Sequence, residues 1–152
     1  MGNYNFHKDL EVEEKNKTFI CEFLGEKGYT ILEDRNDYQY DLLVEKNGKQ
    51  FKVELKEDFK AEETGNVAVE FHSRGKPSGI SKTKAQYYVY TVHLKEKIEI
   101  VIASTRNLRY FFRESFDYRT VVGGDDGSYT KMYLIDYNTF KKLGKVYGTV
   151  ND

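Results

Sequence analysis

Two short apolar runs separated by an Asn-Gly dipeptide constrain the fold of this chain more than any other feature. The first run, over residues 40–45, contains Asp41, and the second, over 50–56, ends in Glu54-Leu55-Lys56. Both residues of Asn47-Gly48 favour the positive φ angles that a tight hairpin turn needs. The sequence therefore predicts two antiparallel strands joined by a hairpin.

Strand alternation decides which side chains of this hairpin share a face. Glu54 and Lys56 are two positions apart, so they point to one side of the strand while its apolar residues point to the other. The neighbouring strand can bring Asp41 beside Glu54. Two carboxylates and a lysine at the end of an apolar sheet are costly unless they hold a hard cation and take part in chemistry.

We therefore expect a magnesium site at this end of the sheet. Mg²⁺ prefers oxygen ligands, keeps several waters and is usually held by one or two carboxylates together with substrate phosphate. Asp41 and Glu54 meet that demand, and the Leu55 backbone carbonyl supplies a third protein oxygen; Mn²⁺ is expected to substitute. Lys56 is positioned to orient or deprotonate an attacking water, or to neutralise charge that develops on a phosphate.

The remaining pattern predicts an α/β fold with a mixed central β-sheet flanked by helices. An apolar stripe at helical spacing, which includes Ile20 and Leu24, indicates a first helix that ends at Gly28. The other helices are expected at 80–85, after a cap at Ser104 or Thr105, and at 138–143. The other strands are expected at 29–32, 66–71, 87–92, 98–103, 119–122 and 131–135, with a loop at 74–79 and a glycine-rich hairpin turn at 123–127.

Composition limits the class of protein. A chain of 152 residues with 39% hydrophobic and 32% charged residues predicts one folded domain over 1–152, with C-terminal strands and helices at 98–145. No apolar run is long enough for a membrane span, and the N-terminus lacks the apolar core of a signal peptide. Cys21 is the single cysteine and is expected in the core, which excludes a disulfide framework and a cysteine-built zinc site. We expect a cytoplasmic protein with no membrane association and no organic cofactor.

Positive charge is concentrated in one segment although the net charge is −1. There is no acidic residue between Glu70 and Glu96, whereas the preceding segment 57–63 is acidic. This change of sign predicts a charged cleft with one basic wall. The alternative is that these lysines and arginines only solvate loops and helix faces. The residues expected to line the basic wall are Arg74, Lys76, Lys82 and Lys84.

The hairpin and its charged residues resemble the PD-(D/E)XK nuclease superfamily, which includes restriction endonucleases, archaeal-type Holliday junction resolvases and many phage nucleases. Tyr40-Asp41 corresponds to the first half of that motif and Glu54-Leu55-Lys56 to the second. The stretches 65–70 and 75–80 also resemble small phage members, and the resemblance covers about residues 9–92. It implies a restriction-endonuclease-like core and a magnesium-dependent DNA endonuclease that hydrolyses phosphodiester bonds. It further implies DNA as partner, a homodimer if branched or duplex DNA is cut symmetrically, and a phage protein in its host cell as one setting.

One position departs from the family pattern. Many relatives carry a glutamate on the first helix about three turns before its closing glycine, whereas this chain has Lys17 there. Glu13 shares a helical face with the apolar stripe and is expected to reach the cleft as a secondary metal ligand, while Glu14 is expected to turn further away. Glu70, at the end of the strand 66–71, is the other secondary ligand. A lysine at the family position favours an altered or lost activity.

Two alternatives follow from the same residues. The first is a non-catalytic module that keeps the nuclease fold and binds nucleic acid or a protein, as Lys17 would permit. The second is a two-carboxylate hydrolase acting on sugars, with Asp41 and Glu54 as acid and base. The neighbouring lysine and the basic segment argue against the second alternative, because neutral glycans need no positive wall.

Overall fold

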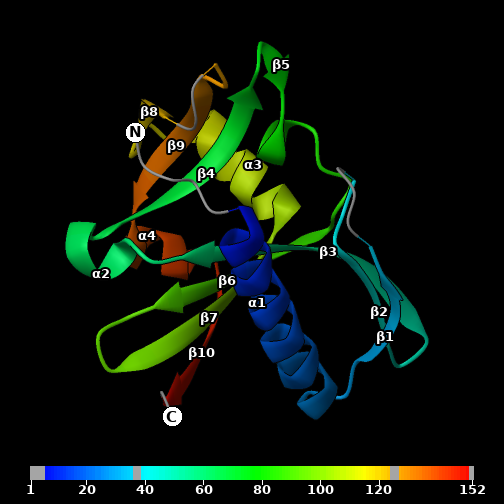
Figure 1. Cartoon of the computed structure of the whole chain (residues 1–152). Helices are drawn as coiled ribbons and strands as arrows, with labels where there is room; N and C mark the ends of the chain where they lie inside the picture. Colours follow the sequence, from blue (N-terminus) through cyan, green and yellow to red (C-terminus); the bar gives the residue numbers. More distant parts are fainter. Residues whose placement is uncertain (1–5, 36–38, 124–126, 151–152) are drawn as a thin grey trace.

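The chain forms two β-sheets and four α-helices in the residues that the structure, a computed structural model, describes: 6–35, 39–123 and 127–150 (Figure 1). The helices are α1 (Phe6–Glu26), α2 (Ala61–Thr64), α3 (Thr105–Glu114) and α4 (Tyr137–Lys142), with a short 3₁₀ helix η1 (Gly79–Ser81). The strands are β1 (Thr30–Asp34), β2 (Leu42–Lys46), β3 (Lys49–Asp58), β4 (Asn66–Ser73), β5 (Lys76–Pro77), β6 (Tyr87–His93), β7 (Lys97–Ser104), β8 (Arg119–Gly123), β9 (Thr130–Asp136) and β10 (Gly144–Val150). The expected mixed α/β class is confirmed.

The larger sheet has six strands in the order β1-β2-β3-β6-β7-β10. The predicted hairpin supplies its second and third strands: β2 pairs antiparallel with β3 from Leu42↔Val53 to Lys46↔Lys49, around Asn47 and Gly48 at φ 54° and 78°. β3 and β6 are parallel, and the other pairs in this sheet are antiparallel. The sheet is therefore mixed, and the connection from β3 to β6 must leave it and return.

A single mixed sheet would have to include the strand at 66–71. In the structure, this strand lies outside the six-stranded sheet. It is β4, and it pairs with β5 and β9 in a second sheet of order β5-β4-β9-β8. Val67 and Val69 alternate into the core as expected. Alternation shows that one face of a strand is buried, but it does not show which strand supplies the hydrogen bonds, and so the expected location was wrong.

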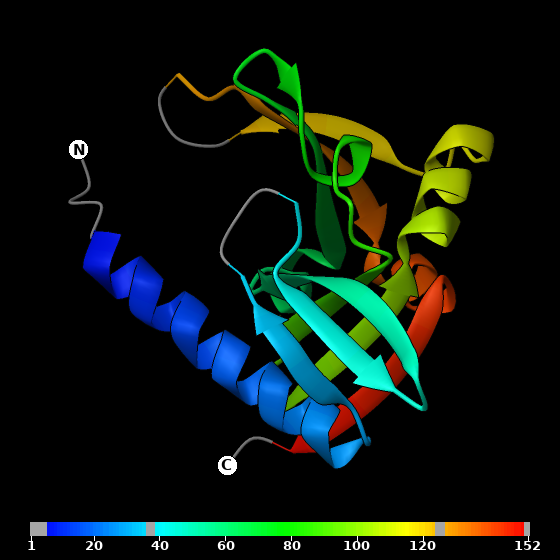
Figure 2. The same ribbon diagram turned by 90° about the vertical axis from the view of Figure 1, so that its right-hand side faces the viewer.

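The core has two parts, one on each face of the six-stranded sheet. On one face, Ile20, Phe23 and Leu24 of α1 pack against Leu42 and neighbouring strand residues, with Cys21 partly buried beside them. The other part contains Tyr88 and Tyr90 of β6, both buried, together with residues of the second sheet, α3 and α4. Figure 2 shows α1 and α3 on opposite sides of the molecule with the large sheet between them.

The helix expected at 80–85 is absent from the described chain, where only η1 forms. The residues after η1 are held by backbone hydrogen bonds to distant parts of the chain: Lys84 N–H donates to Gln39 O and Gln86 N–H donates to Lys52 O. These bonds replace the i→i−4 bonds of a helix, so Lys82 and Lys84 lie on a loop.

Three smaller elements differ from the sequence-based expectation. The helix α2 and the strand β10 were not expected, and the loop at 74–79 contains the short strand β5. Part of the glycine-rich turn at 123–127 lies outside the described residues. Ser104 caps α3, because its side chain accepts a hydrogen bond from Asn107 N–H. Among the described residues, no helix has both the length and the apolar character needed to cross a membrane.

Candidate active site

The residues of the predicted metal site line one cavity of about 350 Å³ between α1 and the end of β3. Asp41, Glu54, Leu55 and Lys56 contribute from the hairpin, and Glu57 follows them on β3. The helix contributes Glu13, Glu14, Asn16 and Lys17. Glu14, which was expected to turn away, therefore faces the same cavity as Glu13.

Asp41 lies immediately before β2 and is held by the backbone of β3. Its N–H donates to Val53 O at 2.9 Å, and its carboxylate oxygen Oδ2 accepts from Leu55 N–H at 2.7 Å. In an extended strand, the N–H and the C=O of one residue point to the same side. The Leu55 carbonyl therefore points toward the Asp41 side of β3, where a third protein oxygen was expected.

Glu54 is partly buried, with 17% of its side chain exposed. Its Oε1 accepts from the Thr83 hydroxyl at 3.3 Å, and its Oε2 lies 3.9 Å from Lys56 Nζ. Burial raises the pKa of Glu54 to about 7, the negative charge of Asp41 adds to this rise, and Lys56 and Thr83 oppose it. The positive charge of Lys56 is thus too small to offset the effects of burial and of Asp41 on the pKa of Glu54. A bound cation would stabilise the ionised form of this carboxyl.

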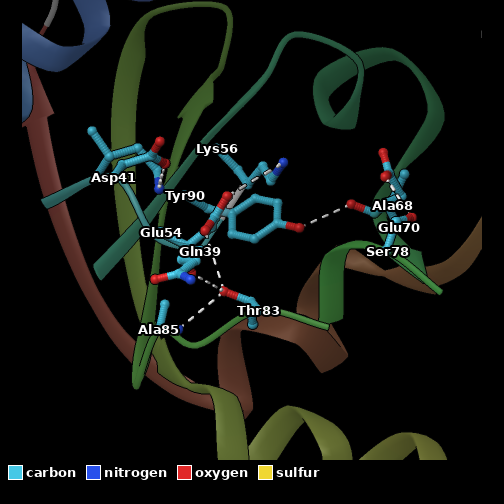
Figure 3. A network of polar contacts seen from close by, with 11 residues as sticks. Gln39, Asp41, Glu54, Lys56, Ala68, Glu70, Ser78, Thr83, Ala85 and Tyr90 are labelled. Atoms are coloured by element: carbon cyan, nitrogen blue, oxygen red, sulfur yellow. Dashed lines mark hydrogen bonds and ion pairs between the residues drawn. The ribbon is translucent and has the colours of Figure 1, made fainter. Parts of the chain in front are cut away.

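Figure 3 shows Asp41, Glu54 and Lys56 at one end of the polar network and Glu70 with Ser78 at the other. The Glu70 carboxylate accepts from the Ser78 hydroxyl at 2.7 Å. It shares with Glu54 a neighbouring cavity of about 480 Å³ rather than the first one. Arg74, Lys76 and Lys82 line the same neighbouring cavity, so three of the four expected basic residues lie next to the carboxylates.

Lys17 lines the cavity of about 350 Å³ that contains Asp41 and Glu54, named here the carboxylate cavity. Its ammonium forms an ion pair with Asp34, which does not line this cavity. Its ammonium donates to Asp34 Oδ1 at 2.7 Å and to Arg35 O at 3.2 Å. Burial acts to lower the pKa of Lys17, and the hydrogen bond and charge of Asp34 outweigh it, so the pKa is raised. Lys17 thus remains a cation in the cavity that the predicted metal ligands line.

Sequence reasoning missed three residues of this region. Asn16 is 8% exposed, lines the carboxylate cavity, and has an Oδ1 atom without a hydrogen-bond partner in the described residues. Its position four residues before Ile20, on the apolar stripe, was the available signal. Glu57 contacts His93 Nε2 at 2.7 Å, and burial raises the pKa of Glu57 although this bond opposes it. Thr83 gave no local signal, because its contact with Glu54 joins residues 29 positions apart.

The donor set is suited to a hard cation that keeps much of its water. Two carboxylates and a backbone carbonyl are the oxygen ligands with which proteins commonly hold Mg²⁺. No group of three or more His, Cys, Asp or Glu side chains is placed so that it could hold a metal ion in residues 6–35, 39–123 and 127–150. Comparisons with models of protein families, with curated proteins and with solved structures found no significant match.

Proposed function

We propose that this protein is a divalent-metal-dependent DNA endonuclease with a restriction-endonuclease-like core. The observation that carries the proposal is the gathering of Asp41, Glu54, Leu55 and Lys56 around one cavity. The succession of α1, β1 and the β2–β3 hairpin, with Glu54 and Lys56 on one face of β3, supports the assignment of this core. DNA is favoured as substrate because Arg74, Lys76 and Lys82 lie beside Glu54 and Glu70 in the adjoining cavity.

The reaction is the attack of water on a phosphodiester, with cleavage of the P–O bond to the leaving strand. A bound Mg²⁺ or Mn²⁺ ion would supply positive charge at the phosphate. The Leu55 N–H holds the Asp41 carboxylate in place before a ligand arrives. With a pKa of about 7, Glu54 is half-ionised near pH 7 and becomes increasingly anionic above it. Lys56, at 3.9 Å from Glu54, can donate a hydrogen bond to the attacking water or to a phosphate oxygen.

Cleavage assays test this proposal directly. The purified protein is incubated with plasmid, single-stranded and four-way-junction DNA in Mg²⁺ or Mn²⁺, and compared with Asp41→Asn and Glu54→Gln. We expect either change to lower cleavage by at least about 100-fold. Glu96→Gln is the matched control, since Glu96 is an exposed carboxylate between β6 and β7. Equal activity of wild type and Glu54→Gln on every substrate would remove the catalytic role.

A second candidate function is a DNA-binding module without catalysis. Lys17 favours it, because its ammonium brings positive charge into the same cavity as Asp41, although its ion pair is with Asp34. Calorimetric titration with Mn²⁺ separates the two functions. The enzyme should bind Mn²⁺ in a manner that Asp41→Asn abolishes, whereas the module should bind DNA with no measurable affinity for the metal.

A further inference from the structure

We infer that bound DNA continues past the carboxylate cavity into a groove between the loop 81–86 and α3, where the protein holds the sugar-phosphate backbone. This inference rests on the proposed function, because it takes DNA as the substrate. It assigns a role to the helix at 105–114, which lies outside the part of the chain that resembles the nucleases.

The groove is large and lined by positive charge. Its volume is about 1140 Å³, and no acidic residue lines it in the described structure. The basic residues that line it are Lys82, Lys84, Arg106, Arg109 and Arg113. A concave surface with one sign of charge favours a polyanion, and an exposed aromatic ring, Tyr110, adds a face on which a base can stack.

The groove is continuous with the candidate active site. Lys82 and Thr83 line both the groove and the cavity of about 480 Å³ described above, named here the basic cavity. Glu54 and Lys56 line both that basic cavity and the carboxylate cavity. The three hollows thus follow one another, and a strand whose phosphate lies at Glu54 can extend along the loop to α3.

The sequence of α3 explains why its arginines reach the groove. Leu108 and Phe112 are buried, so the helix presents the opposite face to the groove. Arg109 donates from Nε to Ile80 O at 2.8 Å and from Nη2 to Thr83 O at 3.1 Å, and therefore fixes the loop against the helix. Arg106 and Arg113 are exposed and line the same groove.

The guanidinium of Arg113 contacts two side chains, Glu114 and Tyr110, and both are exposed. Its Nε lies 3.1 Å from Glu114 Oε2, and its guanidinium lies 5.5 Å from the centre of the Tyr110 ring. An ion pair between two exposed side chains contributes little, so a phosphate can compete for the guanidinium. Arg106 and Arg113 are therefore the residues to change, whereas replacing Arg109 would also release the loop.

The test measures DNA binding without cleavage. Fluorescence anisotropy of a labelled oligonucleotide, single- or double-stranded, is recorded in EDTA over a range of salt concentrations. The groove variant is Arg106→Gln/Arg113→Gln. The control is Lys49→Gln/Lys95→Gln, which removes the same charge from exposed positions away from the three hollows. Thermal unfolding confirms that both variants fold.

We expect the groove variant to bind DNA more weakly, by roughly tenfold or more near 0.1 M salt, with the slope of log K against log salt reduced by about 2. The control should match wild type. Equal affinity and slope in wild type and groove variant, or an equal loss in the control, would overturn the inference. So would a wild-type protein that binds poly-glutamate but not DNA.

The outcome is distinguishable from failure of the proposed catalysis. If the groove variant loses affinity while no metal condition gives cleavage, the groove stands and the endonuclease proposal fails. If wild type cleaves DNA and the groove variant binds it equally well, the endonuclease proposal stands and the groove is excluded.

Discussion

Ionisation of Glu54 costs stability, because its carboxyl is buried beside a second acid. Its pKa in the folded protein, about 7, lies above the ordinary value of 4.5, so the folded state holds the proton more tightly than the unfolded chain. The resulting stabilisation is complete below pH 4.5 and is lost as the pH rises through 7. The difference between these pKa values corresponds to roughly 3 kcal/mol.

Glu54→Gln should remove this loss, because the amide keeps the size of the side chain and cannot ionise. Urea denaturation should give nearly equal free energies of unfolding for wild type and variant at pH 4, and a more stable variant at pH 8, by up to about 3 kcal/mol. Glu96→Gln serves as the control, with a difference from wild type that does not change with pH. A Glu54→Gln variant that follows the pH dependence of wild type contradicts this account.

Thr83 opposes the rise in the pKa of Glu54, because its hydroxyl hydrogen-bonds to the carboxylate. Thr83→Val keeps the shape and removes the hydroxyl, so the pKa of Glu54 should move further upward. Carboxyl ¹³C chemical shifts, followed against pH, measure it. Thr83→Ser retains the hydroxyl and should titrate close to wild type; an unchanged titration in Thr83→Val would show that the hydrogen bond is not important.

At the scale of elements, the position of η1 against β4 decides where the loop with Lys82 and Lys84 lies. Gly79 has φ +49°, and a Cβ atom there would collide with the Glu70 carbonyl group. This close approach places Ser78 where its hydroxyl reaches the Glu70 carboxylate at 2.7 Å. The loop that carries Lys82 and Lys84 starts from this contact.

Gly79→Ala should therefore destabilise the protein by more than an ordinary glycine substitution in the same backbone region. Gly75→Ala is the matched control, since Gly75 has φ +76° and no neighbouring atom within 4 Å of the added Cβ. We expect a loss of about 1 kcal/mol for the control and at least about 2 kcal/mol for Gly79→Ala, measured by urea denaturation. Equal losses would show that β4 and η1 separate without cost.

At the scale of the whole molecule, the carboxylate cavity lies between α1 and the large sheet, so a ligand there links two parts of the fold. Anything that binds only the folded protein stabilises it, by about 2.7 kcal/mol at a concentration 100 times Kd. Under the proposed function, a metal ion would compete with the proton on Glu54, whose pKa is about 7. Binding should therefore strengthen as the pH rises through 7.

Mn²⁺ should accordingly raise the thermal unfolding temperature more at pH 8 than at pH 6, with an increase that grows with metal concentration. Differential scanning fluorimetry is sufficient for this measurement. Asp41→Asn, which removes one ligand charge, should show little or no increase at either pH. An equal increase in wild type and Asp41→Asn would place the metal elsewhere on the protein.

Local sequence patterns were sufficient for the elements that build the site. The stripe around Ile20 and Leu24 predicted α1, and Asn47-Gly48 with strand alternation predicted the β2–β3 hairpin. Alternation also predicted that Glu54 and Lys56 share a face, and their charged groups lie 3.9 Å apart. Each of these features depends on residues close in sequence, whose backbone preferences and side-chain period act within a few positions.

Only the tertiary structure decided which distant segments meet. The second sheet depends on β4 pairing with β9, and β10 depends on pairing with β7. The loop after η1 is not helical because Lys84 and Gln86 bond to Gln39 and Lys52, and Thr83 meets Glu54 only through that loop. By itself the sequence determined the hairpin and the face that its charged residues occupy. The pairing partners were decided by hydrogen bonds and burial across the whole chain, which no short pattern specifies.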